Sequence, residues 1–202
     1  MTDFMELRKL GDASMRSGSY QTAKDQYCAA WDLYAEQRKT YAEAGKVREF
    51  DERHTAQDAF WLLMSGANAQ FGAGDFEGCL DTCMTAFDLF KELGYVVGNP
   101  FFHLRVGQAS FELDAPGDDN GREMTIDNLA RALICGGIEI FSGEAPEYLD
   151  TVLEVLRPPE GYSSWHDARG YGASVDKLNG ATGFLAETFA AKYGAPPPYP
   201  EG

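Results

Sequence analysis

Apolar residues recur every three or four positions along most of the chain, which predicts amphipathic helices. The clearest stretches lie on either side of short turns at Gly18 and Gly74, and the same spacing returns after Pro100. Proline suits the first turn of a helix, so Pro100 predicts the start of a new helix. Patterns that alternate between apolar and polar residues, as strands do, are lacking. The sequence therefore predicts an all-α protein.

An internal repeat with an offset of 56 residues organises these helices. Gly18-Ser19-Tyr20 aligns with Gly74-Asp75-Phe76, and the segment 30–34 aligns with 86–90. Each copy reads as a helix, a glycine turn that ends it, and a second helix. Small residues that allow close packing of the second helix are Ala23, Ala30 and Ala86. One helix pair cannot bury its own apolar face, so we expect the copies to stack.

The copies resemble tetratricopeptide repeats. The residues on that family's spacing are Leu10, Gly11, Gly18, Tyr20, Ala23, Tyr27 and Ala30 in the first copy, and Ala67, Gly74, Phe76, Cys79, Cys83 and Ala86 in the second. A third copy is visible at 106–111, followed by Leu129 and Ala132. The resemblance implies about three helix-turn-helix pairs and C-terminal capping helices, in one right-handed curved domain over residues 1–166.

Several segments depart from the family's unit of about 34 residues. Residues 35–58 are charged, and we interpret them as an extension of the second helix plus a polar connection. Residues 115–121 read as a lengthened, solvated turn, and 138–156 as one or two capping helices. Residues 167–202 form a C-terminal extension, with one possible helix at 174–193 and a flexible, proline-rich end.

A narrower resemblance covers residues 60–165. The block 99–113, the Leu129-Ala130-Arg131-Ala132 pattern, Pro158-Pro159-Glu160-Gly161 and Trp165 are similar to elements of small bacterial tetratricopeptide-like proteins. Members of that group resemble immunity proteins of polymorphic toxin systems. The resemblance implies a protein without catalytic activity that binds and neutralises a cognate toxin domain. A cytosolic adaptor or chaperone that holds a peptide or protein tail in its groove is the alternative.

The charge balance narrows the choice of partner. Thirty-two acidic residues against 17 basic ones give a net charge of −15, which disfavours nucleic acid and anionic membranes as partners. Residues 111–150 hold ten acidic and two basic side chains. We therefore expect a basic protein partner and an acidic face that includes Asp118, Asp119 and Glu123. No secretory signal or membrane span is visible, which predicts a cytoplasmic protein; the homo-oligomeric state is left open.

The sequence gives little sign of catalytic or metal chemistry. Cys79 and Cys83 are four residues apart and could form half of a zinc site, but both fall at positions that face the paired helix. All four cysteines read as reduced, buried thiols. The acidic run 112–127 lacks the ligand spacing of an EF-hand, and Gly72-Ala73-Gly74 is the turn of the repeat. We expect no catalytic, cofactor or metal site.

Tetratricopeptide arrays have a concave groove lined by the first helix of each pair. The resemblance places ten residues there: Lys9, Asp12 and Arg16 from copy one, Trp61, Ser65 and Asn68 from copy two, and Phe101, Arg105, Gln108 and Glu112 from copy three. Aromatic residues among polar ones are typical of binding surfaces. Burial of Trp61 and Phe101 between helix pairs is an equal alternative.

Overall fold

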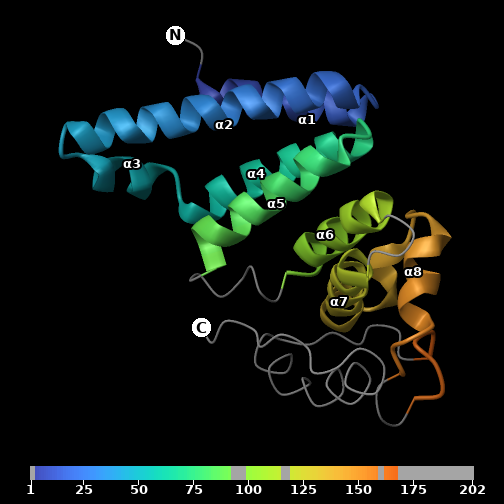
Figure 1. Cartoon of the computed structure of the whole chain (residues 1–202). Coiled ribbons are helices and arrows are strands. Elements are labelled where there is room, and N and C mark those ends of the chain that lie inside the picture. Colours follow the sequence, from blue (N-terminus) through green and yellow to red (C-terminus); the bar gives the residue numbers. More distant parts are fainter. Residues whose placement is uncertain (1–2, 92–98, 115–118, 159–161, 168–202) are drawn as a thin grey trace. The chain divides into compact units, whose positions relative to one another are not determined.

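The computed structural model describes residues 3–91, 99–114, 119–158 and 162–167. Within these residues the protein is all-helical, as the sequence predicts, with eight α-helices, one short 3-10 helix and no strand (Figure 1). The elements are α1 (Phe4–Arg16), α2 (Tyr20–Glu43), α3 (Val47–Arg53), α4 (Ala56–Gly72), α5 (Phe76–Phe90), α6 (Pro100–Leu113), α7 (Asp119–Gly136), η2 (Ile138–Phe141) and α8 (Pro146–Leu153). The chain divides into two compact units, Met1–Phe90 and Lys91–Gly202.

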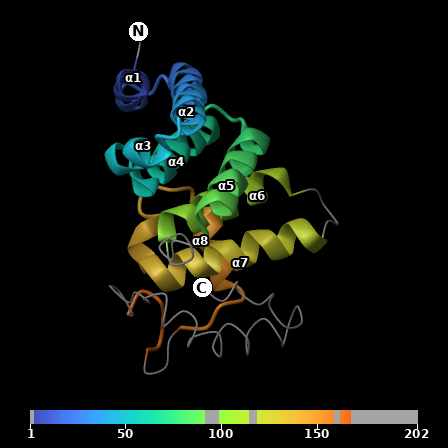
Figure 2. The same ribbon diagram turned by 90° about the vertical axis from the view of Figure 1, so that its left-hand side faces the viewer.

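The first unit contains two of the expected helix pairs. Helix α1 packs against α2, α4 packs against α5, and α2 also contacts α4. Figure 2 views α1 and α2 nearly end-on, as two cylinders side by side. The turns within the pairs contain Gly18 and Gly74, whose φ angles of 72° and 77° are costly for residues with a side chain. The expected glycine turns are thus confirmed.

Equivalent positions of the two pairs are buried at the contact between their helices. Ala23 and Ala30 of α2 are fully buried, and so are Cys79 and Ala86, which lie 56 residues later on α5. Cys83 is likewise buried, at the position equivalent to Tyr27, so both cysteines of α5 pack in the core as expected.

The expectation that all four cysteines are buried is wrong for Cys28. This residue is exposed on α2, and Cys135 is only partly buried. Cys28 lies one position beyond the buried Tyr27, and a step of about 100° around a helix turns the side chain away from the core.

Residues 35–58 contain more structure than the predicted polar connection. Helix α2 continues to Glu43, as expected, but after a turn at Gly45 the chain forms α3 and folds back beneath the end of α2 (Figure 1). Helix α3 has only seven residues and buries one of them, Phe50. Thr55 and Asp58 then form a reciprocal capping box at the start of α4.

The second unit begins with the third helix pair. Pro100 is at the start of α6, and the Asn99 side chain accepts hydrogen bonds from the backbone N–H groups of the next two non-proline residues, Phe101 and Phe102. Helix α6 packs on α7. The predicted turn at 115–121 is too long, because α7 begins at Asp119; residues 115–118 lie outside the described residues.

Short helices follow α7, as expected for a C-terminal cap. Both η2 and α8 contact α7, and η2 also contacts α6. Trp165 is buried, and its indole N–H donates to the Leu156 carbonyl at 3.2 Å. The predicted helix at 174–193 and the proline-rich end lie outside the described residues.

Candidate functional site

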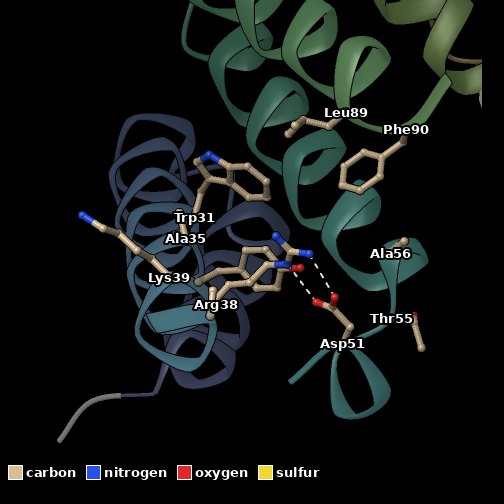
Figure 3. Close-up of a pocket in the computed structure, with 11 residues that line it drawn as sticks. Trp31, Ala35, Arg38, Lys39, Asp51, Thr55, Ala56, Leu89 and Phe90 are labelled. Atoms are coloured by element: carbon tan, nitrogen blue, oxygen red, sulfur yellow. Dashed lines mark hydrogen bonds and ion pairs between the residues drawn. The ribbon is translucent and has the colours of Figure 1, made fainter. Parts of the chain in front are cut away.

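A cavity of about 590 Å³, here called the large cavity, opens at the surface of the first unit (Figure 3). Helix α2 forms one wall, the end of α5 forms another, and α3 and the start of α4 close the third side. Its lining residues are Trp31, Tyr34, Ala35, Arg38, Lys39, Ala42, Asp51, Thr55, Ala56, Leu89 and Phe90. The cavity exists because α2 extends past its pair and α3 returns beside it.

Aromatic rings give the large cavity a rigid apolar side. The rings of Trp31 and Tyr34 stack, with centroids 5.3 Å apart and planes 18° apart. Tyr34 is buried and also packs edge-on against Phe4 and at a tilt against Phe50. Burial raises the pKa of Tyr34, so its hydroxyl stays neutral over the physiological pH range. The Trp31 ring therefore packs on Tyr34, which core residues hold in place.

An ion pair forms the polar side of the cavity. Arg38 Nε lies 2.8 Å from Asp51 Oδ1, and Arg38 Nη2 lies 2.9 Å from Asp51 Oδ2, so the contact is bidentate (Figure 3). Hydrogen bonding to the Asp51 carboxylate raises the pKa of the already basic Arg38. This bond uses two of the five N–H donors of the guanidinium and fixes its plane.

The large cavity has an apolar side and a polar side, so it suits a ligand with an apolar group next to a polar one. Leu89 is 55 % exposed at the opening, although leucine is normally buried. Trp31 and Phe90 are half-buried beside it. A leucine or aromatic side chain placed there would remove these surfaces from water, at about 25 cal/mol for each Å² buried.

Two of the predicted groove residues in the first unit, Asp12 and Ser65, interact with the hydroxyl of the buried Tyr27. Tyr27 donates to Asp12 Oδ1 at 2.5 Å, and Ser65 also interacts with the Tyr27 hydroxyl. Ser65 in turn donates to the Trp61 carbonyl at 2.8 Å, and Trp61 is half-buried. Helix α1 also contacts α4. Among the remaining members, Lys9 and Arg16 on α1 are exposed, and Asn68 on α4 is half-buried.

The predicted groove residues of the second unit are engaged within that unit. Gln108 is fully buried and its amide donates to Glu144 Oε2 at 2.7 Å, which differs from the expected groove position. The Tyr148 hydroxyl of α8 donates to Glu112 Oε1 at 2.5 Å. Burial raises the pKa of Tyr148, and Arg105 opposes that shift electrostatically. These contacts attach the cap to α6.

The exposed residues of the predicted set lie elsewhere on the second unit. Phe101 is 59 % exposed at the start of α6. In the described structure this ring is therefore not buried. Glu123 of the predicted acidic face is exposed on α7. Asp119 is the first residue of α7, and Asp118 lies outside the described residues.

None of the ten predicted groove residues lines the large cavity. The available signal was Trp31, an aromatic residue next to polar ones on the overlong helix, together with Arg38 and Asp51 thirteen residues apart. Within the residues described, no cluster of three His, Cys, Asp or Glu side chains could hold a metal ion. No helix of the described part is long and apolar enough to cross a membrane.

Comparison with protein-family models, with curated proteins and with solved structures gives no match for this chain.

Proposed function

We propose that this chain is a helical-repeat protein of the tetratricopeptide type, without catalytic activity, that binds another protein through the large cavity. The observation that carries the proposal is the half-exposed apolar lining of Trp31, Leu89 and Phe90 beside the Arg38–Asp51 ion pair. Hot spots in protein interfaces have this composition, with aromatic anchors and arginine in a pocket that excludes water.

The repeat assignment draws support from the two helix pairs of the first unit. Both turn at a glycine with positive φ, and the buried positions of α2 and α5 correspond at an offset of 56 residues. The contact between α2 and α4 joins one pair to the next, as stacking of repeats requires.

We further propose that the partner is a basic toxin domain, which this protein neutralises as an immunity protein. The net charge of −15 favours a partner of opposite charge, because electrostatic complementarity speeds encounter and rejects wrong partners. Reversing the charges of Asp118, Asp119 and Glu123 is then expected to slow association and to weaken its dependence on salt.

A matched pair of leucine variants tests the cavity as the binding surface. Leu89 and Leu10 are 55 % and 52 % exposed, but only Leu89 lines the large cavity. Tagged wild-type protein, Leu89→Asp and Leu10→Asp are used to isolate partners from the source organism, which mass spectrometry then identifies. We expect one partner that Leu89→Asp loses and Leu10→Asp retains. Equal recovery by both variants contradicts the proposed surface.

Growth then tests the proposed role. The partner identified in this way is expressed alone and together with this protein in a susceptible host. We expect the partner alone to arrest growth and coexpression to restore it. A partner that is harmless when expressed alone contradicts the immunity role and favours the adaptor role.

A further inference from the structure

A second, smaller cavity of about 110 Å³, here called the small cavity, lies next to the large one in the first unit. Cys28, Trp31 and Asp32 of α2 line it on one side, Thr82 of α5 on another, and α4 contributes Gln70. Trp31 lines both cavities, so the two hollows are neighbours along α2.

The side-chain oxygen of Gln70, a residue that lines the small cavity, lacks a hydrogen-bond partner. Its side chain is only 7 % exposed, and its Oε1 atom is buried without a hydrogen-bond partner. A buried acceptor without a hydrogen bond destabilises the folded protein. A ligand that brings an N–H donor into the small cavity would recover that free energy.

The surroundings of the small cavity favour a donor that is positively charged. Asp32 lines the cavity, and Asp25 and Asp75 also act electrostatically on the neighbouring Cys28 thiol. Asp75 is paired with Lys24 at 2.8 Å, and Lys24 opposes the effect of these carboxylates on Cys28. Asp25 and Asp32 are exposed, and among the described residues no cationic group lies within salt-bridge distance of either carboxylate. The Trp31 ring adds a face on which a guanidinium or ammonium group can rest.

The two cavities follow the same direction along three helices. From the small cavity to the large one, the lining residues run from 27 to 42 on α2, from 82 to 90 on α5, and from 70 to 56 on α4. At 1.5 Å per residue, their centres are about 10 Å apart along α2. Residues seven positions apart on a partner helix have that separation.

We propose that a helix of the partner protein lies along α2 and α5, with an arginine or lysine in the small cavity and a bulky apolar residue in the large one. The two residues are seven positions apart on the partner helix, and the acidic side chains Asp25 and Asp32 favour the cation at the small cavity. This inference rests on the proposed function and names the element that a basic partner would present.

Selection from a displayed library of amphipathic helices tests the inference without knowledge of the natural partner. We expect enriched helices to carry Arg or Lys at one position and Leu, Phe or Trp seven residues away. Enrichment of helices without this pair, or of no helix at all, overturns the inference.

Two substitutions in the first unit separate the anchors. Gln70→Leu keeps the volume and removes the buried acceptor, so we expect a folded protein whose preference for the cation over an alanine control falls about tenfold. Leu89→Asp should reduce binding of the same helices through loss of the apolar anchor. Unchanged cation preference in Gln70→Leu overturns the assignment of the small cavity.

Cys28 provides an independent local readout, because this exposed thiol lines the small cavity. In a Cys135→Ser background, saturation with an enriched helix should slow alkylation of Cys28 at least tenfold. An unchanged rate overturns the inference. If the natural partner is lost in Leu89→Asp while no displayed helix is enriched, the proposed function stands and only the helical binding mode fails.

Discussion

The ammonium group of Lys24 on α2 lies 2.8 Å from the Asp75 carboxylate in the turn before α5, and so connects the two helix pairs of the first unit. Asp75 also accepts a hydrogen bond from the Gly78 N–H at 3.1 Å. One carboxylate therefore caps α5 and pairs with the neighbouring helix pair.

This ion pair predicts a specific dependence of stability on pH. Hydrogen bonding to Lys24 lowers the pKa of Asp75 below its ordinary value of 3.8, so the stabilisation is present at neutral pH and is lost as the pH falls through the lowered pKa. It is also lost at alkaline pH, as the pH rises through the raised pKa of Lys24.

We expect Asp75→Asn, which keeps a capping oxygen, to lower the free energy of unfolding at pH 7 by about 0.5–1 kcal/mol. The difference should shrink as the pH falls through the lowered pKa of Asp75, and Asp81→Asn on the exposed side of α5 should cause no loss of stability. Urea denaturation at several pH values measures this, and a difference that persists at low pH contradicts the account.

The Arg38–Asp51 ion pair should contribute little to stability. The two side chains are 48 % and 42 % exposed, so solvent screens their attraction. A double-mutant cycle with Arg38→Met and Asp51→Asn is expected to give a coupling energy of at most about 1 kcal/mol. A coupling of several kcal/mol would show that α3 depends on this pair more than on its apolar contacts.

Close packing of α1 on α2 predicts a sharp difference between adjacent alanines. Ala30 is fully buried and Ala29 is exposed on the same helix. Ala30→Phe should overpack the contact and lower the free energy of unfolding by about 1–3 kcal/mol, whereas Ala29→Phe should have little effect. Equal melting temperatures for the two variants contradict this arrangement.

The thiols should react in a defined order with iodoacetamide. Cys28 is exposed and reacts first, but partial desolvation of its sulfur raises its pKa, so its rate should rise with pH until the pH passes that raised pKa. Burial raises the pKa of Cys135 to about 11, which makes it slower. Cys79 and Cys83 are fully buried and should react only on unfolding. Mass spectrometry of peptides gives the order, and early labelling of Cys83 contradicts it.

Periodicity and glycine positions were enough to predict the helix pairs of the first unit. The offset of 56 residues correctly matched Gly18 with Gly74 and Ala30 with Ala86, because a helix contact needs small residues at regular spacing and a turn needs positive φ. Pro100 likewise marked the start of α6. These signals are local, so one sequence carries them.

The large cavity could not be predicted in this way, because it depends on contacts between distant residues. Residues 35–58 look polar, and Phe50, the one buried residue of α3, gives no periodic signal. The burial of Gln108 was missed for the same reason, since its partner Glu144 belongs to the cap and lies 36 residues away. Assigning residues by the family's spacing identified the faces of the helices. It did not identify the residues that cover those faces.

The large cavity can be lost without unfolding of the helix pairs, because helix α3 forms one of its walls. A seven-residue helix is not stable alone, so α3 persists through Phe50 and its aromatic neighbours Tyr34, Tyr41 and His54. A local opening of residues 44–54 would remove one wall of the cavity while both glycine-turn hairpins stay folded. Amide hydrogen exchange in α3 then measures how often the proposed binding surface is assembled. Substitutions at Phe50 would change the affinity for a partner without changing the residues that contact it.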